Sequence, residues 1–386
     1  MNKLLWVIIV LSCIITACNQ RSKHIIRFST FNIWELSSQK LCTIDEKGTG
    51  RDPQVLAAAT IIQRIRPDIL VINEIDHDYA FPEDLTKNAR RFLDAYLNQG
   101  EAAITYPYIF TAPCNTGIRS GLDFNNDGKM ADADDLQTRS FGEDCFGYGQ
   151  YPGQYAMALL SKYRVDTTHV RTFQKFLWKD LPGNHIPPGY YSDEELAIFR
   201  LSSKSHWDVP IVIHDKTIHL FISHPTPPVF DGPEDRNGRR NFDEIKFWRH
   251  YIENDHALYD DNNSSGGFAR DDSFIIAGDL NASPDASVTY DNQTAIGQLL
   301  YYPKIQDPKE FVFRRNKKDC HPTVKKAGTA QFGHGQHVRV DYLLPSRAIK
   351  VIDGGVFWPD LQVDPQGFML AEKASDHRLV WLDIKL

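Results

Sequence analysis

Several apolar, β-forming runs of this chain stop abruptly at a carboxylate, an amide or an imidazole. The clearest is IIAGDLNASP, from Ile275 to Pro284, in which an apolar run ends at a glycine and then presents Asp279 and Asn281. A polar group left in a core without a partner costs about 1–3 kcal/mol. The strands that carry such ends must therefore finish where their polar groups can meet one another, water or a ligand. This requirement restricts the possible folds strongly.

Strand and helix patterns alternate along the chain. One helix is expected to start at Asp52, which can cap it, and Pro53, which suits a first turn. Another is expected over Asn241–Asn254, with Asn241 as the cap and Glu244 at the capping-box position. The expected strands are 25–36, 69–72, 154–165, two within 208–228 joined by a turn at 214–216, then 274–278, 339–346 and 377–384, with a further helix near 295–300. No repeat and no long linker divides the 386 residues, so one two-sheet α/β sandwich covered by helices fits best.

The first 17 residues have the pattern of an export leader. Lys3 precedes an apolar stretch, Leu4 to Ile15, that is shorter than the roughly 20 residues needed to cross a bilayer. The residues before Cys18 resemble a bacterial lipobox, which predicts a signal peptide over 1–17, lipidation of Cys18 and a tether over 18–24. Ordinary cleavage beside an incidental cysteine is the alternative. Lipidation would leave an exported protein that touches the membrane only through its anchor, and Asn19 favours the outer membrane in a Gram-negative cell.

Export would place the remaining cysteines in an oxidising compartment, where disulfides form. These cysteines are Cys42, Cys114, Cys145 and Cys320. The pair Cys114–Cys145 is favoured because it brackets one loop-like region, although spacing alone does not determine the connectivity.

Six strand ends carry the polar groups that matter for function. They are Asn32 in TFNIW, Glu74 in LVINEID, His224 in ISHPTPP, Asp279 with Asn281 in AGDLN, Asp341 in RVDYLL, and Asp376 with His377 in ASDHRL. Each residue alone is more commonly a turn former or a solvated strand terminus. Together, carboxylates and amides from separate strands make the hard-oxygen site that Mg²⁺ or Mn²⁺ prefers. An imidazole beside a second carboxylate suits a nucleophilic water and a charged transition state.

The chain order of these motifs resembles the endonuclease/exonuclease/phosphatase superfamily, which includes pancreatic-type deoxyribonuclease, abasic-site endonucleases, neutral sphingomyelinases and inositol-polyphosphate phosphatases. The resemblance rests on F-N-I, the glutamate after an apolar strand, S-K-Y, G-D-L-N, R-V-D-Y and S-D-H, and it covers roughly Ile25 to Leu386. It implies a four-layer α/β sandwich with two mainly antiparallel sheets packed face to face and helices outside. On this basis residues 25–386 form one domain with an insertion around 111–152.

The resemblance also implies roles for the matching positions. Glu74, Asn32 and Asp376 would hold the metal ion. Asp279 would orient and deprotonate the attacking water, and Asn281 would hold a phosphate oxygen and that water. In the same way His377 would contact the scissile phosphate, Asp341 would orient its ring, and His224 would contact the phosphate or the leaving group.

The predicted insertion contains a calcium-loop pattern, DFNNDGKMADAD. Asp123, Asn125, Asp127, Lys129 and Asp134 occupy positions 1, 3, 5, 7 and 12, and a glycine occupies position 6. The pattern resembles the loops of dockerin-like extracellular modules and predicts a structural Ca²⁺. A loop rich in Asx turns is the alternative, because apolar flanking helices are not evident.

A basic segment precedes the helix expected at Asn241. Arg236, Arg239 and Arg240 lie just before it, where free backbone N–H groups and guanidinium groups can bind an anion. The segment predicts a contact to a second phosphate or a distal substrate group. Pairing with surface acids such as Glu234 and Asp235 is the alternative.

Taken together, these features predict a monomeric, exported, divalent-metal-dependent phosphoesterase. The formal net charge of −7 argues against a dedicated binder of duplex DNA and favours small or lipid phosphoesters. An extracellular nuclease acting on DNA or RNA is the first alternative. A non-catalytic surface binding module held by Ca²⁺ is the second, and the complete set of strand-end residues argues against it.

Overall fold

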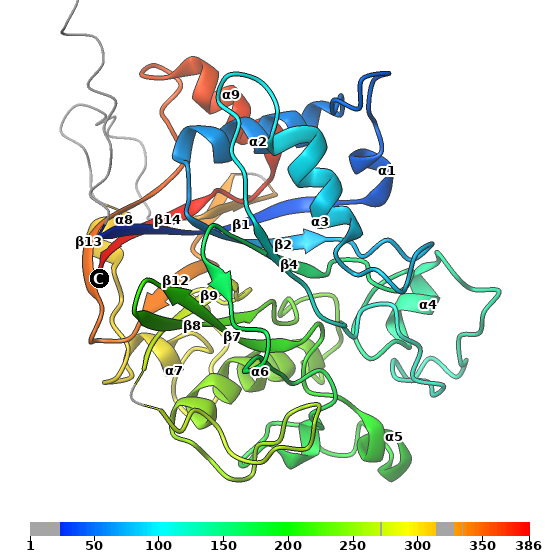
Figure 1. The fold of residues 1–386 in the computed structure, drawn as a ribbon. Helices are drawn as coiled ribbons and strands as arrows, with labels where there is room; N and C mark the ends of the chain where they lie inside the picture. The colour runs from blue at the N-terminus through cyan, green and yellow to red at the C-terminus, as the bar shows by residue number, and fades with distance from the viewer. Residues whose placement is uncertain (1–23, 271, 314–327, 334) are drawn as a thin grey trace, which may run out of the picture.

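The computed structural model describes residues 24–270, 272–313, 328–333 and 335–386 (Figure 1). The predicted leader with Cys18, most of the predicted tether and Cys320 lie outside the described residues. None of the described helices combines the length and the apolar character that a membrane span needs.

The first sheet has six strands in the order β13-β14-β1-β2-β4-β3. Neighbours run antiparallel except β1 and β2, which are parallel. The strands are β1 (Ile25–Leu36), β2 (Ile69–Ile75), β3 (Tyr108–Phe110), β4 (Met157–Ser161), β13 (Lys350–Val356) and β14 (Val380–Lys385).

The second sheet runs β12-β9-β8-β7-β5, and β6 also pairs with β7. Here β8 and β9 form the parallel pair. The strands are β5 (Arg164–Val165), β6 (Arg171–Thr172), β7 (His206–Ile213), β8 (Lys216–Ser223), β9 (Ser273–Asp279) and β12 (Asp341–Pro345), and a separate hairpin is formed by β10 (Ala330–Phe332) and β11 (Gln336–Val338).

Helices cover the outer faces of both sheets (Figure 1). The layer over the first sheet contains α2, α3 and α9, and α6 and α7 lie against the second. The bounds are α1 (Ser38–Leu41), α2 (Pro53–Ile65), α3 (Lys87–Phe92) followed by the π-helix η1 (Leu93–Leu97), α4 (Arg139–Glu143), the 3₁₀ turn η2 (Trp178–Asp180), α5 (Asp193–Ile198), α6 (Arg236–Ile252), α7 (Gly297–Leu300), α8 (Lys309–Val312) and α9 (Pro365–Ala374).

Three apolar clusters fill the spaces between these layers. One lies between the sheets and includes Phe28 and Leu220, one lies between the first sheet and its helices and includes Ile62, and one lies under α6 and includes Trp248. Each sheet is therefore buried on both faces, which explains the continuous apolar runs of its strands. The predicted α/β sandwich of two face-to-face sheets with helices outside is confirmed.

Two expected helices had different outcomes. In α2 the side chain of Asp52 accepts hydrogen bonds from two first-turn amides, as the sequence predicts. The helix ends at Arg66, which has a left-handed conformation. The second helix was expected to start at Asn241, and this expectation is wrong, because α6 already begins at Arg236. Asn241 and Glu244 are buried inside that helix and bind neighbouring loops, so their polar side chains are not caps.

The expected strand 154–165 is also wrong as a single element. It divides into β4 and β5, which belong to different sheets, so the chain crosses from one sheet to the other at residues 162–163. The predicted disulfide is absent too, since Cys114 and Cys145 are free thiols. Cys114 Sγ lies 3.0 Å from Thr116 Oγ1, and Cys145 Sγ lies 3.1 Å from the Phe141 carbonyl oxygen.

Gly278 allows β9 to pass close to β8 immediately before Asp279. Its φ is +143°, and a Cβ atom there would lie 2.2 Å from the Ser223 carbonyl oxygen. We expect Gly278→Ala to lower the free energy of unfolding by about 1–3 kcal/mol, because backbone cannot yield as a flexible side chain can. Gly100→Ala is the control, since Gly100 also has positive φ but open space around its Cβ position. Equal losses for both variants in urea denaturation would contradict the steric argument.

Candidate active site

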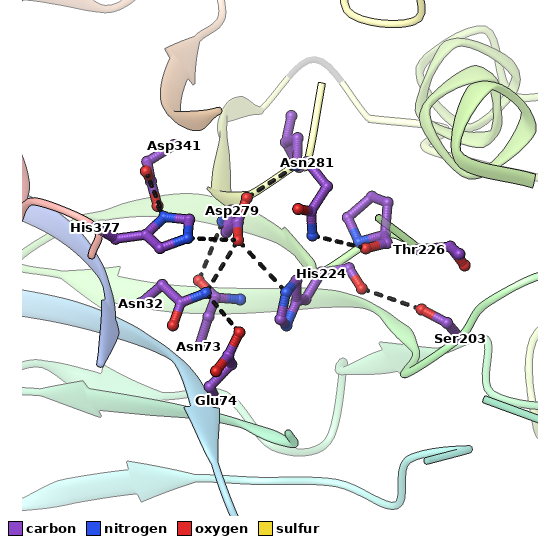
Figure 2. A network of polar contacts seen from close by, with 12 residues as sticks. Asn32, Asn73, Glu74, Ser203, His224, Thr226, Asp279, Asn281, Asp341 and His377 are labelled. Carbon is purple, nitrogen blue, oxygen red and sulfur yellow. Dashed lines mark hydrogen bonds and ion pairs between the residues drawn. The ribbon is translucent and has the colours of Figure 1, made fainter. Parts of the chain in front are cut away.

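Paired strand positions bring the predicted polar residues to one edge of the sandwich (Figure 2). In the first sheet, Asn32 on β1 pairs with Asn73 on β2, and Glu74 follows. In the second sheet, Asp279 at the end of β9 pairs with Asp341 at the start of β12. The apolar residues of these strands fill the core, so their polar residues converge where the strands end.

Asp279 is the centre of this arrangement. Its Oδ2 accepts a hydrogen bond from Asn32 Nδ2 at 3.0 Å, and its Oδ1 accepts one from the backbone N–H of Asn281 at 2.9 Å. Its own backbone N–H donates to Asn73 Oδ1 at 3.1 Å, which joins the two sheets. Asn281 is held in turn, because its Nδ2 donates to the Pro225 carbonyl oxygen at 3.1 Å.

Two imidazoles flank the Asp279 carboxylate from opposite sides (Figure 2). His377 Nε2 lies 3.7 Å and His224 Nε2 lies 3.5 Å from Asp279 Oδ2. The other nitrogen of His377, Nδ1, lies 2.9 Å from Asp341 Oδ2, so His377 bridges two carboxylates. Asp341 is fixed by Thr329, whose Oγ1 accepts its backbone N–H.

The electrostatics of the two imidazoles differ. Burial alone would lower the pKa of His377, but the charges of Asp341 and Asp279 outweigh it and raise that pKa to about 10. Burial, together with the charge of Lys204, lowers the pKa of His224. Burial opposes ionisation of Asp279, yet His377 and His224 hold its pKa well below the usual range. At neutral pH the site therefore has an ionised Asp279 between one protonated and one neutral imidazole, a division typical of acid–base chemistry.

The residues predicted to hold a metal ion lie beside this group. Asn32 Nδ2 also donates to Glu74 Oε1 at 3.0 Å, while Asn32 Oδ1 is buried and has no hydrogen-bond partner among the described residues. Glu74 has a φ of +63°, a strained conformation common at functional sites. An unused amide oxygen next to a carboxylate fits a hard divalent cation.

Asp376, the third residue predicted to hold the metal ion, accepts a hydrogen bond from its neighbour in sequence. Its Oδ1 accepts a hydrogen bond from Ser375 Oγ at 3.3 Å. Burial raises the pKa of Asp376, and the negative charges of Glu74 and Asp279 contribute to the same shift, so Asp376 belongs to this acidic edge. A second possible cation site is formed by Asp279, Asp341 and His377, whose ligand atoms lie within 4.8 Å of one another.

A family model described as Endonuclease/Exonuclease/phosphatase family matches residues 29–377. The chain belongs to this family. The match begins within β1 and ends at His377, so it includes every strand end described above.

Solved structures that are similar to this chain have low sequence identity to it. One from Beutenbergia cavernae is 17% identical, with 94% of this chain and 72% of that chain covered and a TM-score of 0.50. One from Leptotrichia buccalis is 12% identical, with 94% and 100% covered and a TM-score of 0.49. A mannosyl-6-phosphatase from Bacteroides thetaiotaomicron is 12% identical, with 94% and 100% covered and a TM-score of 0.48. At 17% identity the likeness to the Beutenbergia cavernae structure concerns the fold alone. No curated protein matches this chain.

The structure does not bring the three arginines to this family site as a free anion-binding group. Arg240 is 7% exposed, and its guanidinium donates to the carbonyl oxygens of Leu201, Phe146 and Arg200, so the prediction that it holds a substrate phosphate is wrong. Arg239 donates to the Glu234 carbonyl oxygen. Arg236 donates to a backbone carbonyl and to a tyrosine hydroxyl. For these two a substrate contact remains a prediction.

The predicted calcium loop has its side chains turned to its own backbone. Asp123 accepts hydrogen bonds from the amides of Asp127 and Gly128, Asn125 accepts one from Asp127, and Asp127 accepts one from Lys129. Among the described residues, the loop's carboxylates, including Asp134, form no cluster of three within ligand distance. This geometry is the Asx-turn alternative, and Ca²⁺ binding remains a prediction.

Two functional positions were missed from the sequence. Asn73 is fully buried and supports Asp279, and a polar residue at the end of an apolar strand could have identified it. Glu244 accepts the backbone N–H groups of Ser203 at 2.7 Å and of Thr226 at 2.6 Å, and so fixes the loops on both sides of His224. No local pattern distinguishes this role from a helix cap.

Proposed function

We propose that this protein is an exported, divalent-metal-dependent phosphoesterase that cleaves small or lipid phosphoesters by attack of water. The observation that carries the proposal is the Asp279 carboxylate held between the imidazoles of His377 and His224, beside the Glu74–Asn32 pair. Membership of the family supports a phosphoesterase type of reaction.

Asp279, His377 and Asp341 would each have a separate role in an in-line displacement at phosphorus. Asp279 accepts a hydrogen bond from the attacking water and orients it towards phosphorus. The protonated His377 donates a hydrogen bond from its Nε2–H to a phosphoryl oxygen, where negative charge increases in the transition state. Asp341 keeps that ring aligned and charged through Nδ1. When a substrate phosphate binds His377, the negative phosphate offsets part of the positive charge of that imidazole. The pKa of Asp279 then rises, and Asp279 becomes a better base.

Glu74 and Asn32 would hold the metal ion, with Asp376 close to it. A bound Mg²⁺ or Mn²⁺ supplies charge neutralisation at the phosphoryl oxygens. Asn281 would contribute a phosphate contact with the amide hydrogen that does not bind Pro225.

The net negative charge of the chain supports small or lipid phosphoesters over nucleic acid. The predicted leader and lipidation at Cys18 support a location in the cell envelope, where a scavenging phosphoesterase would act on external substrates.

A substrate panel tests this proposal. Phosphomonoesters, phosphodiesters, phospholipids, DNA and RNA are each assayed with Mg²⁺, Mn²⁺ or Ca²⁺ and after removal of metal with EDTA. We expect turnover of a small or lipid ester that falls about 100-fold or more on chelation and returns with Mg²⁺ or Mn²⁺. Preferred cleavage of DNA or RNA would favour the nuclease alternative. Turnover of no substrate would favour the binding module, and turnover that resists chelation would contradict the metal requirement.

A further inference from the structure

Lys204 is a buried lysine in the loop that leads into β7. It is 6% exposed. Its carbonyl oxygen accepts the Asn115 amide at 2.9 Å, and the preceding residue, Ser203, donates Oγ to the His224 carbonyl oxygen at 3.3 Å. Figure 2 shows Ser203 beside His224, on the side of Asp279 that faces away from His377. The backbone of Lys204 is thus held at the His224 end of the candidate active site.

The ammonium group of Lys204 has no counter-ion in the part of the chain that the structure describes. No hydrogen bond or ion pair joins its Nζ atom to a described residue, whereas Lys246 Nζ donates to the Gly183 carbonyl oxygen at 2.6 Å and lies 3.5 Å from Asp291. A buried charge without a partner is costly, so such groups normally pair or neutralise.

The nearby carboxylates already bind other donors. Glu244, Glu74 and Asp279 are the acidic groups that act on Lys204, and they offset part of the effect of burial, which lowers its pKa. Glu244 is bound by two backbone amides, and Glu74 by Asn32 and by the Glu35 amide. Asp279 is bound by Asn32 and the Asn281 amide. Three anions therefore attract Lys204 towards the site without any of them pairing with it.

We propose that Lys204 binds a non-bridging oxygen of the substrate phosphate from the His224 side, opposite His377. This inference rests on the proposed phosphoesterase function, because the anion that completes the Lys204 environment is the phosphate of the substrate or product. Lys204 then supplies a fixed positive charge at a place where the chain tolerates an unpaired ammonium. The unpaired ammonium group that would bind the phosphate is the same group whose burial destabilises the protein without phosphate.

Lys204→Met tests the proposal, because methionine keeps the length and burial of the side chain and removes the charge. The free energy of unfolding and the affinity for inorganic phosphate are measured in excess Mg²⁺. We expect Lys204→Met to weaken phosphate binding about 10- to 100-fold, as loss of a charge-assisted hydrogen bond would. We also expect it to be at least as stable as the wild type without phosphate, since a lone buried charge is removed.

Lys246→Met is the matched control, because this lysine on α6 is paired and partly buried. It should retain phosphate affinity. Wild-type phosphate affinity in Lys204→Met would overturn the proposal, as would a loss of stability without phosphate, which would mark Lys204 as structural. The proposed function fails separately, if the wild type binds phosphate but hydrolyses none of the panel substrates.

Discussion

Asp279→Asn should lower kcat/KM for the preferred phosphoester by about 10²- to 10⁴-fold, the range for loss of a group that orients and deprotonates a nucleophile. The amide keeps the shape of the side chain and can still accept the Asn281 N–H bond. It loses the negative charge that attracts His377 and His224. The measurement is steady-state kinetics, with circular dichroism to show that the variant is folded.

Asp285→Asn is the control for Asp279→Asn. Asp285 is exposed in the loop that follows Asn281, and its replacement should leave kcat/KM unchanged. A folded Asp279→Asn protein with activity within threefold of the wild type, about 0.7 kcal/mol, would refute the assignment of Asp279 as the centre of the reaction.

His377→Ala should lower kcat by about 10²- to 10⁴-fold, because the protonated imidazole is the group placed to stabilise charge on the phosphoryl oxygens. The variant also leaves Asp341 buried without its partner. Activity is measured from pH 6 to pH 10, and ring-nitrogen NMR follows the imidazole of the wild type. Wild-type rates in His377→Ala would contradict this role.

Asp341→Asn keeps the imidazole of His377 but removes the carboxylate that stabilises its positive charge. Because Asp341 raises the pKa of His377, the substitution should lower that pKa from about 10 and move the alkaline limb of the pH–rate profile to lower pH. The folded pKa lies above the ordinary value of imidazole. The raised pKa of His377 therefore contributes stability that is present below about pH 6.5 and is lost as the pH rises towards 10. Burial raises the pKa of Asp341 to about 6, so Asp341 itself loses its charge in more acidic solution. In Asp341→Asn this stability should be smaller at neutral pH, as urea denaturation at pH 7 would measure.

The strand ends were predictable because they follow local rules. An apolar run of four to eight residues is a strand, and a carboxylate or amide at its end cannot enter the core. Asp279 and Asp341 could be named from the sequence in this way, and pairing of β9 with β12 then brings them together. The α2 helix was predictable for the same reason, since Asp52 caps it through adjacent backbone amides.

Contacts between distant segments were not predictable. Glu244 has the sequence context of a capping residue, but its carboxylate binds two loops that lie 41 and 18 residues away along the chain. Arg240 has the context of an anion site, but three backbone carbonyls enclose it. Cys114 and Cys145 lie within one insertion, but their Sγ atoms have other neighbours.

The sequence by itself determined which residues could take part in phosphoester chemistry, because residue type and position at a strand end are local properties. Only the tertiary structure decided which of them share a proton, which are enclosed by backbone and which retain an unpaired charge. Those properties depend on desolvation and on distances of a few ångströms between residues far apart in the chain. His377 and Lys204 both have side chains that can carry a positive charge, and only the fold gives the first two carboxylate partners and the second none among the described residues.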